Sequence, residues 1–231
     1  MFEREHHRRV AYVLESLDAG LLKASACLFG GGTAIALRYG EYRESVDIDF
    51  LVSERDGYRA LRQRIGGPGG LRAILRSGRT LEQLRDVRAD QYGLRTAVRV
   101  DGIEIKFEIV LEGRITLELP GAGDEVCGVA TLTPLDLAAS KLLANSDRWA
   151  DDAVFSRDLI DLAMMAPPKK LLVAAIEKAR GAYGDSIEND LRKAIDALRA
   201  RPHRLDRCME AMQMRSVPKA LLWKRIKALA R

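Results

Sequence analysis

A glycine-rich turn that leads into an Asp-x-Asp segment is the feature that most limits what this chain can fold into. Residues 29–37 read Phe-Gly-Gly-Gly-Thr-Ala-Ile-Ala-Leu. The apolar run at 26–29 is typical of a short buried strand, and residues 33–39 have the composition of a short helix. Because a glycine turn at the start of a helix presents backbone N–H groups, this stretch predicts a phosphate-binding turn.

Two carboxylates follow on the next predicted strand. Within residues 46–52, Asp47 and Asp49 alternate with apolar side chains, so both aspartates lie on one face of a strand. Residues two apart on a strand are separated by roughly 6.5–7 Å, which allows both carboxylates to bind the same pair of divalent ions. Either motif alone is weak evidence, since glycine serves any tight turn and Asp-x-Asp is common in solvated loops. An unpaired carboxylate in an apolar strand is costly, so the two motifs together predict a site for a nucleoside triphosphate and Mg²⁺.

This arrangement resembles the core of the DNA polymerase beta-like nucleotidyltransferase superfamily. The closest resemblance is to the AbiEii/AbiGii toxin branch, and it rests on the sequence Gly-Gly-Gly-Thr-Ala-Ile-Ala-Leu-Arg followed by Ser-Val-Asp-Ile-Asp-Phe. The resemblance implies that Gly31, Gly32 and Thr33 bind the nucleotide's phosphates, and that Asp47 and Asp49 belong to a set of three carboxylates that holds metal. The rest of the chain must supply the third carboxylate.

A predicted β-hairpin offers two candidates for it. Residues 92–100 and 103–111 are rich in strand-forming side chains and are joined by an Asp-Gly pair, which is a strong turn signal. The charged side chains of the second run share one face: Glu104, Lys106 and Glu108. The resembled family carries Lys-x-Asp or Lys-x-Glu on this strand, which implies that Glu108 is the third metal ligand. Glu104 remains an alternative, and so does an exposed edge strand with a salt-bridged ladder.

Composition restricts the class of protein without identifying its activity. The chain has 231 residues, 47% of them hydrophobic and 31% charged, which is typical of an ordinary folded protein. Its apolar runs are far shorter than the about 18 residues that cross a membrane, and the charged amino terminus does not resemble an export signal. Three widely spaced cysteines favour reduced thiols and a cytoplasmic location. A net charge of +5 suits a polyanionic partner but does not require one.

The second half of the chain changes character. Residues 114–119 are still predicted to form a short strand, but after residue 131 alanine and leucine dominate and every segment predicts helix. We therefore expect a nucleotidyltransferase core domain at 1–130 and a helical domain at 131–231. The predicted fold class is α+β: a nucleotidyltransferase-fold mixed β-sheet with flanking helices, followed by a C-terminal α-helical bundle.

Two stretches of the predicted helical domain resemble further motifs of the toxin family. The segment at 131–144 is similar to its third motif, which implies that Lys141 reaches the nucleotide. Arg-Asp-x-x-Asp-Leu at 157–162 matches its fourth motif, which implies that Asp158 acts at the active site with support from Arg157 and Asp161. From the residues alone, Lys141 is instead a surface lysine with little effect on stability. In the same reading, the two aspartates are helix-start carboxylates, with Asp161 paired to Arg157.

These expectations combine into one predicted function. Two Mg²⁺ ions held by Asp47, Asp49 and Glu108 would support transfer of a nucleoside monophosphate from an NTP such as ATP to an acceptor. The resemblance implies the toxin of a bacterial toxin–antitoxin system, with a cognate antitoxin as partner and tRNA or another RNA as acceptor. Basic faces at 55–64 and 219–231 are compatible with contacts to an RNA backbone. The alternatives are a small-molecule acceptor of the antibiotic type, or a non-catalytic module that binds a nucleotide or a partner.

Overall fold

The computed structural model describes residues 2–230, so Arg231 of the predicted basic tail lies outside the described residues. Backbone contacts divide the chain into two units. The first contains the residues up to Leu37 together with Ser45–Thr133, and the second contains Arg38–Glu44 together with the residues from Pro134 onward. The predicted division at residue 130 treats both domains as continuous stretches, whereas the second unit also includes a short segment from the first half of the sequence.

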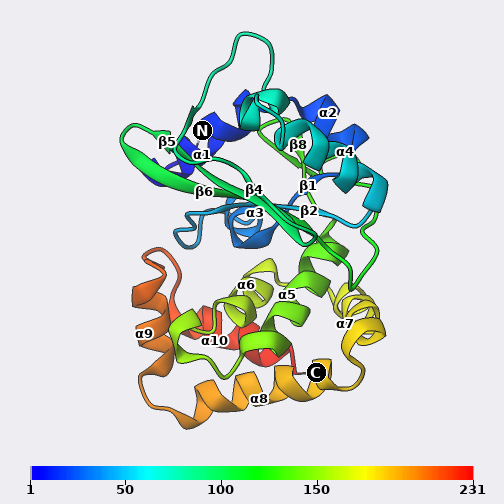
Figure 1. Cartoon of the computed structure of the whole chain (residues 1–231). Helices are drawn as coiled ribbons and strands as arrows, with labels where there is room; N and C mark the ends of the chain where they lie inside the picture. The colour runs from blue at the N-terminus through cyan, green and yellow to red at the C-terminus, as the bar shows by residue number, and fades with distance from the viewer. Residues whose placement is uncertain (1, 231) are drawn as a thin grey trace. The chain divides into compact units, whose positions relative to one another are not determined.

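A mixed sheet forms the centre of the first unit (Figure 1). Its strands follow the order β1 (Leu28–Phe29), β2 (Ile48–Val52), β6 (Ile103–Leu111), β5 (Gly93–Val100) and β3 (Glu82–Gln83), with β4 (Arg88–Ala89) also paired to β5. Strands β2 and β6 are parallel, and the other neighbours are antiparallel. The predicted α+β class is confirmed.

Aromatic packing fixes the middle of this sheet. The rings of Phe29, Phe50 and Phe107 come from β1, β2 and β6, and their centroids are 5.6 and 5.5 Å apart. All three side chains are buried. Since successive residues of a strand point to opposite faces, burial of Phe50 and Phe107 turns their neighbours Asp49 and Glu108 toward the other face.

Helices and a small hairpin complete the first unit. They are α1 (Glu5–Ser16), α2 (Ala19–Ala24), α3 (Gly31–Arg38), α4 (Arg55–Ile65), the 3₁₀ turn η1 (Gly70–Ile74) and the hairpin of β7 (Glu125–Val126) with β8 (Val129–Ala130). The predicted strand at 114–119 is wrong, because this segment joins no ladder of the described structure. Its Leu117 N–H is bonded to the Ser53 hydroxyl instead of to a neighbouring strand, and Leu119 is exposed.

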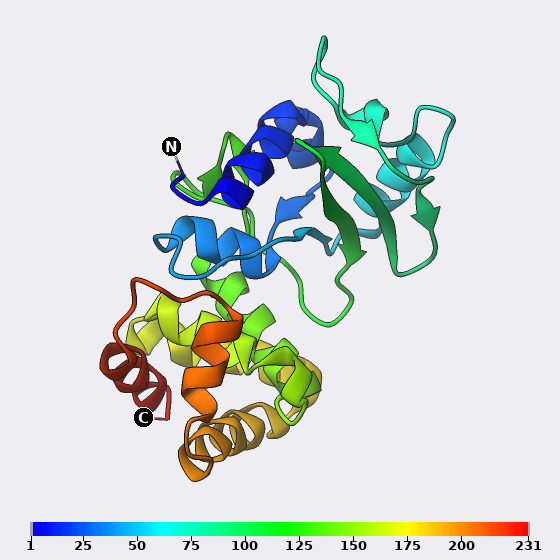
Figure 2. The ribbon, with the colours of Figure 1, turned by 90° about the vertical axis from the view of Figure 1, so that its left-hand side faces the viewer.

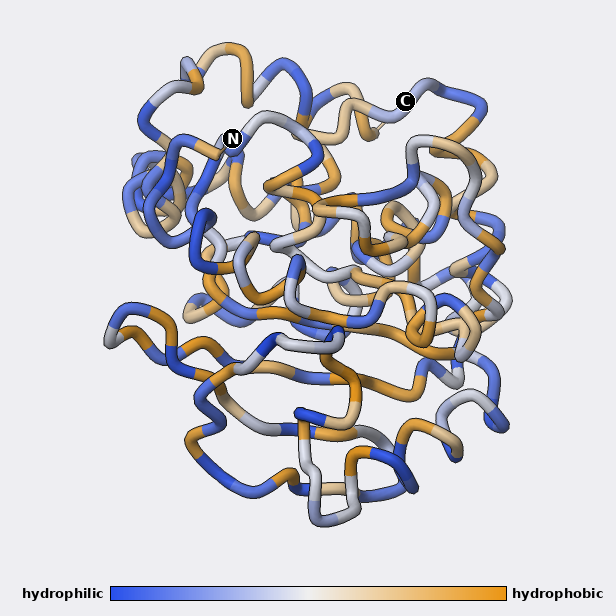
Figure 3. The backbone as a smooth tube through the Cα atoms, turned by 90° about the horizontal axis from the view of Figure 1, so that it is seen from above, coloured by the Kyte–Doolittle hydropathy of each residue, from blue (hydrophilic) through white to orange (hydrophobic). Residues whose placement is uncertain are grey.

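The second unit is helical beyond its short segment Arg38–Glu44. Its helices are α5 (Pro134–Arg148), α6 (Arg157–Met165), α7 (Lys169–Tyr183), α8 (Ser186–Ala200), α9 (Arg204–Ala211) and α10 (Lys219–Ala228), with a 3₁₀ turn η2 (Asp152–Val154). Helix α5 packs on α6, α7 and α8, as a small bundle requires. Figure 3 shows hydrophilic and hydrophobic residues interspersed along the backbone. Within residues 2–230, the structure has no helix with the length and hydrophobicity of a membrane span.

Candidate functional site

The glycine turn and the second aspartate of Asp-x-Asp are in direct contact. The Gly30 N–H donates to the Asp49 carbonyl oxygen at 2.8 Å. Gly31 has a φ of +66°, and a Cβ atom at this position would lie 2.3 Å from Asp49 Oδ2. Any other residue at 31 would therefore strain the backbone and displace the carboxylate. The two motifs that the sequence analysis combined form one local structure in the first unit.

Helix α3 begins at Gly31, two residues after strand β1 ends at Phe29. The first N–H groups of a helix have no carbonyl partner within the helix, which leaves those of Gly31, Gly32 and Thr33 suited to an anion. The Thr33 side chain has a different role, because it is buried and its Oγ1 lies 2.8 Å from Ser45 Oγ and 2.5 Å from the Asp47 carbonyl oxygen. The Thr33 side chain therefore holds the segment that leads to Asp47 through these hydrogen bonds.

Two of the three predicted metal carboxylates lie side by side on neighbouring parallel strands. Asp49 on β2 is the register partner of Glu108 on β6, and neighbouring strands are about 4.8 Å apart. Asp47 lies one residue before β2 begins, so it is outside the ladder. Glu104 lies four residues from Glu108 on β6, about 13 Å along a strand, and pairs with Arg85.

Arg95, which is not among the predicted site residues, lies in the same row. It is the β5 partner of Glu108, its Nε lies 3.9 Å from Glu108 Oε2, and its Nη1 lies 3.0 Å from Asp90 Oδ2. A partly exposed guanidinium therefore borders the carboxylates. The predicted two-residue turn contained the signal for this residue, because pairing Val100 with Ile103 and counting back sets Arg95 opposite Glu108.

The donor set fits a divalent cation in its chemistry. Carboxylate oxygens are the ligands that Mg²⁺ prefers, and Mg²⁺ often uses one or two of them together with substrate phosphates and water. Asp49 and Glu108 supply such a pair, both partly exposed. Among residues 2–230, no group of three or more His, Cys, Asp or Glu side chains is gathered closely enough to form a complete metal cage. Asp49 and Glu108 therefore form a candidate pair, whereas the described structure does not gather Asp47 with them into a group of three.

Lys141 and Asp158 belong to a buried ionic network in the second unit. Lys141 Nζ lies 2.9 Å from Asp158 Oδ1 and 2.8 Å from Asp161 Oδ2, and the Lys141 side chain is only 8% exposed. Its interpretation as a surface lysine is therefore wrong. Arg148 binds Asp158 through Nε at 2.7 Å and Nη2 at 3.0 Å.

Asp161 is the most enclosed member of this network. It accepts from Arg43 Nε at 2.6 Å, from Arg43 Nη2 at 2.9 Å and from the Tyr42 hydroxyl at 2.6 Å. Tyr42 and Arg43 come from the segment Arg38–Glu44, which explains why this segment belongs to the helical unit. The expectation that Asp161 pairs with Arg157 missed these partners, because they lie more than 100 positions away in the sequence.

Burial and pairing act in opposite directions on the pKa values of the network. Burial raises the pKa of Asp158, but Lys141 and Arg148 outweigh it and hold that pKa well below its usual range. Burial also raises the pKa of Asp161, and Arg43 and Lys141 reverse the shift in the same way. For Lys141, burial lowers the pKa but the two aspartates raise it further. The network stays ionised, and a further carboxylate, Asp147, also acts on Arg148.

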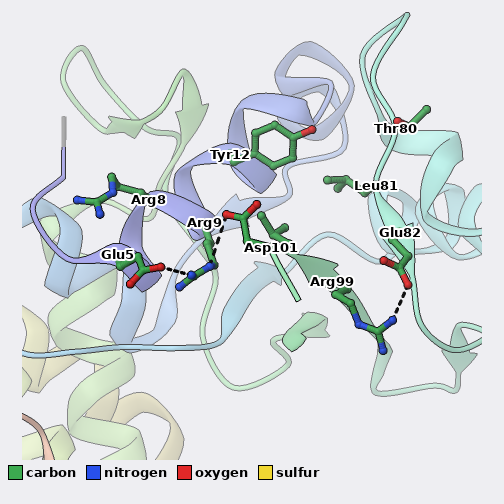
Figure 4. Close-up of a pocket in the computed structure, with 10 residues that line it drawn as sticks. Glu5, Arg8, Arg9, Tyr12, Thr80, Leu81, Glu82, Arg99 and Asp101 are labelled. Atoms are coloured by element: carbon green, nitrogen blue, oxygen red, sulfur yellow. Dashed lines mark hydrogen bonds and ion pairs between the residues drawn. The ribbon is translucent and has the colours of Figure 1, made fainter. Parts of the chain in front are cut away.

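A cavity of about 430 Å³ also lies in the first unit, between α1, the strand β3 and the hairpin turn after β5 (Figure 4). Its charged side chains neutralise one another: Arg9 pairs with Glu5 and with Asp101, and Arg99 pairs with Glu82 at 2.7 Å. None of the predicted metal carboxylates lines it. This cavity lacks the excess positive charge that a triphosphate requires.

Comparison with solved structures finds proteins of similar fold. The chain is similar to a protein from H. pylori whose crystal structure is described as that of a candidate nucleotidyltransferase. Their TM-score is 0.53 at 16% identity, covering 99% of this chain and 96% of the other. JHP933 from Helicobacter pylori gives a TM-score of 0.50 at 15% identity, covering 100% and 94%. At these identities the likeness concerns the fold alone.

The family follows from the sequence. Residues 14–229 match the model of the family described as nucleotidyl transferase AbiEii toxin, type IV TA system, and the chain belongs to this family. It is therefore a nucleotidyltransferase, and membership implies a nucleotide substrate and a cognate antitoxin. No curated protein matches the chain.

Proposed function

We propose that the protein is the toxin of a type IV toxin–antitoxin pair and transfers a nucleoside monophosphate from an NTP to RNA in a Mg²⁺-dependent reaction. The observation that carries the proposal is the packing of Gly31 on Asp49, with Asp49 opposite Glu108 in the register. This packing brings the backbone N–H groups at the start of α3 next to the Asp49 carboxylate. A nucleoside triphosphate with its metal ion needs both backbone N–H donors for the phosphates and carboxylates for the metal.

Each residue then has a defined task. The backbone N–H groups of Gly31, Gly32 and Thr33 would bind phosphate oxygens, and Asp47, Asp49 and Glu108 would hold two Mg²⁺ ions. When bound, the metal lowers the pKa of the attacking hydroxyl and neutralises charge on the departing pyrophosphate. Glu108 is favoured over Glu104 because Glu108 lies opposite Asp49, whereas Glu104 is paired with Arg85.

The second unit is proposed to act through Lys141 and Asp158. Lys141 would counter the charge of the nucleotide's phosphates, and Asp158 would orient the ammonium group, to which it is bonded at 2.9 Å. The two carboxylates that Lys141 contacts keep its ammonium group charged, as a role toward an anion requires. Both residues also hold the helical unit together, so their variants must be judged on rate and on stability.

An RNA acceptor, with tRNA as the first candidate, is supported by the charge of the molecule. Helix α4 exposes Arg55, Arg59 and Arg62 on one side and Arg64 on another. Helix α10 exposes Lys224 and Lys227. Only 6% of the residues are aromatic, which favours contacts to a structured RNA backbone over stacking on loose bases.

The decisive experiment incubates the purified protein with Mg²⁺, each labelled NTP in turn and total tRNA. Labelled tRNA is expected with at least one NTP, and none is expected with EDTA. Binding to tRNA should weaken with salt with a log–log slope of about −3 to −6, as contact with roughly four to eight phosphates implies. Charge reversal at Arg59 and Arg62 should lower RNA affinity and spare NTP binding. A flat salt response, with label on a small molecule only, would support an antibiotic-type acceptor instead.

A further inference from the structure

The backbone that carries Asp47 is not held by the sheet. Strand β2 begins at Ile48, whose register partner on β6 is Phe107. Residues 45–47 precede this ladder, so the usual strand hydrogen bonds do not fix them. A metal ligand on a loose segment loses affinity and rate, because catalytic groups must stay within a fraction of an ångström of their working position. Something else must hold this segment.

Side chains from α1 and α3 contact each of these three residues. The Ser45 N–H donates to His7 Nε2 at 3.1 Å, and the Val46 carbonyl oxygen lies 3.0 Å from His6 Nε2. Thr33 Oγ1 donates to the Asp47 carbonyl oxygen. His6 and His7 are neighbours on α1, which lies beside this segment in Figure 2.

The Nε2 atoms of the two histidines have opposite hydrogen-bonding roles, one as acceptor and one as donor. His7 Nε2 receives an N–H and must be unprotonated, so its imidazole is neutral with the proton on Nδ1. His6 Nε2 faces a carbonyl oxygen and must carry a proton. His7 is fully buried, whereas His6 is partly exposed. Of the two histidines, the buried His7 therefore constrains the segment more strongly.

We propose that His7 is a positioning residue for nucleotidyl transfer: its neutral imidazole fixes the Ser45–Val46 backbone and so sets the position of the Asp47 carboxylate, with His6 as a weaker second support. The inference rests on the proposed role of Asp47 as a metal ligand. Both histidines precede residue 14, where the match to the family begins, so this support comes from outside the matched region.

Two amide variants test the proposal directly. In His7→Gln the side-chain oxygen reaches the place of Nε2 and can still accept from the Ser45 N–H. In His7→Asn the shorter side chain cannot. Both variants bury a neutral amide, so a purely structural role of His7 predicts the same result for both. We expect His7→Gln to retain transfer within about 3-fold of the parent and His7→Asn to lose about 10- to 100-fold, the usual effect of removing a residue that orients a metal ligand.

Metal binding gives a readout that does not depend on turnover. Mn²⁺ serves as the probe, and its binding to the full-length protein in the presence of a non-hydrolysable NTP is followed by electron paramagnetic resonance. The Kd for Mn²⁺ should rise about 10-fold in His7→Asn and stay near the parent value in His7→Gln. His203→Asn is the matched control, because His203 is an exposed histidine at the start of α9 in the other unit.

The outcomes separate the inference from the proposed function. A parent protein that neither binds Mn²⁺ nor transfers a nucleotide overturns the proposed function, and the inference with it. An active parent whose His7→Gln and His7→Asn variants behave alike overturns the inference alone. If His7→Asn does not fold, His6→Ala decides the matter, since it removes only the partly exposed contact to Val46. It should raise the Kd for Mn²⁺ about 3-fold, a small share of the usual effect, and an unchanged Kd would refute the proposal.

Discussion

The two units use their aspartates in opposite ways. In the first unit, Asp47 and Asp49 lie partly exposed beside a glycine turn. In the second unit, Asp158 and Asp161 are buried, and each is bonded to two cationic side chains of the same chain. A carboxylate that is surrounded by cations of its own protein serves structure first, whereas one that keeps access to solvent can accept a metal ion.

The expected energetic cost of a substitution also differs between the two kinds of aspartate. Removing one partner from a buried ion pair leaves an uncompensated charge and costs about 3–5 kcal/mol. Removing a partly exposed metal ligand costs the fold little but removes transition-state stabilisation. Substitutions of similar chemistry should therefore separate into two classes, one that lowers the rate and one that lowers the melting temperature.

The largest effect is expected for Asp47→Asn and Asp49→Asn. Each keeps the shape of the side chain and removes a metal-binding charge, so nucleotide transfer should fall by at least about 10³-fold, equivalent to about 4 kcal/mol of transition-state stabilisation. The melting temperature should remain near that of the parent. Rates with labelled NTP and tRNA, together with calorimetry, check both statements, and normal transfer by a folded double variant would refute the metal site.

Asp161→Ala should show the converse. It leaves Arg43 and Lys141 without their shared partner in a buried setting, so the free energy of unfolding should fall by about 3–5 kcal/mol. Lys141→Ala should behave similarly on stability, and any further loss of rate well below its melting temperature would measure its role toward the nucleotide. The control is Asp196→Ala, since the pair of Asp196 with Arg199 is exposed and contributes about 0–1 kcal/mol. Equal melting temperatures for Asp161→Ala and Asp196→Ala would contradict the comparison.

Gly31→Ala should fall between these classes. Its new Cβ would push against Asp49 Oδ2, and the positive φ adds about 1–2 kcal/mol of strain. We expect a loss of transfer of about 10- to 100-fold, since displacing a catalytic group by about 1 Å has an effect of this order. Gly78→Ala is the matched control, because Gly78 also has a positive φ but nothing within 4 Å of a Cβ. It should lose stability only, and an equal loss of rate in both variants would argue against contact between the turn and the carboxylate.

The smallest effect concerns pH. The folded-state pKa values of Asp158 and Asp161 are depressed, so their stabilisation is present above the unfolded value of about 3.9 and is lost as pH falls below it. The pKa of Lys141 is raised, so its contribution is present below about 10.4 and lost at higher pH. Stability from the network should be constant between about pH 5 and 9. The difference in melting temperature between the parent and Asp161→Ala should shrink below about pH 4, and a constant difference down to pH 2 would contradict this linkage.

Local patterns predicted much of the fold. The alternation in residues 103–111 and the Asp-Gly turn predict the hairpin of β5 and β6, and the helical character of the sequence after residue 131 predicts the C-terminal helices. The hairpin β7–β8 was missed because strands of two residues have no periodicity to detect.

The site could be predicted only where its residues are close in sequence or where pairing follows from a turn. The contact of Gly31 with Asp49 spans one helix, and the motif order suggested it. The bond from Tyr42 to Asp161 joins residues 119 positions apart, and no local pattern indicates which carboxylate meets which cation. Residue type also failed to predict burial of Lys141, since a lysine beside an apolar stripe is usually exposed.

The segment Arg38–Glu44 has a consequence for how the protein is made. It leaves the ribosome about 90 residues before α5 begins, yet Tyr42 and Arg43 find their buried partner only on α6. The helical unit therefore cannot finish folding from its own continuous sequence. A fragment cut at Thr133 would carry Arg43 without Asp161, and the complementary fragment would carry the reverse. We expect each fragment to be unstable when it is expressed alone. When the two fragments are produced together, Arg43 can pair with Asp161 again, and the helical unit should fold.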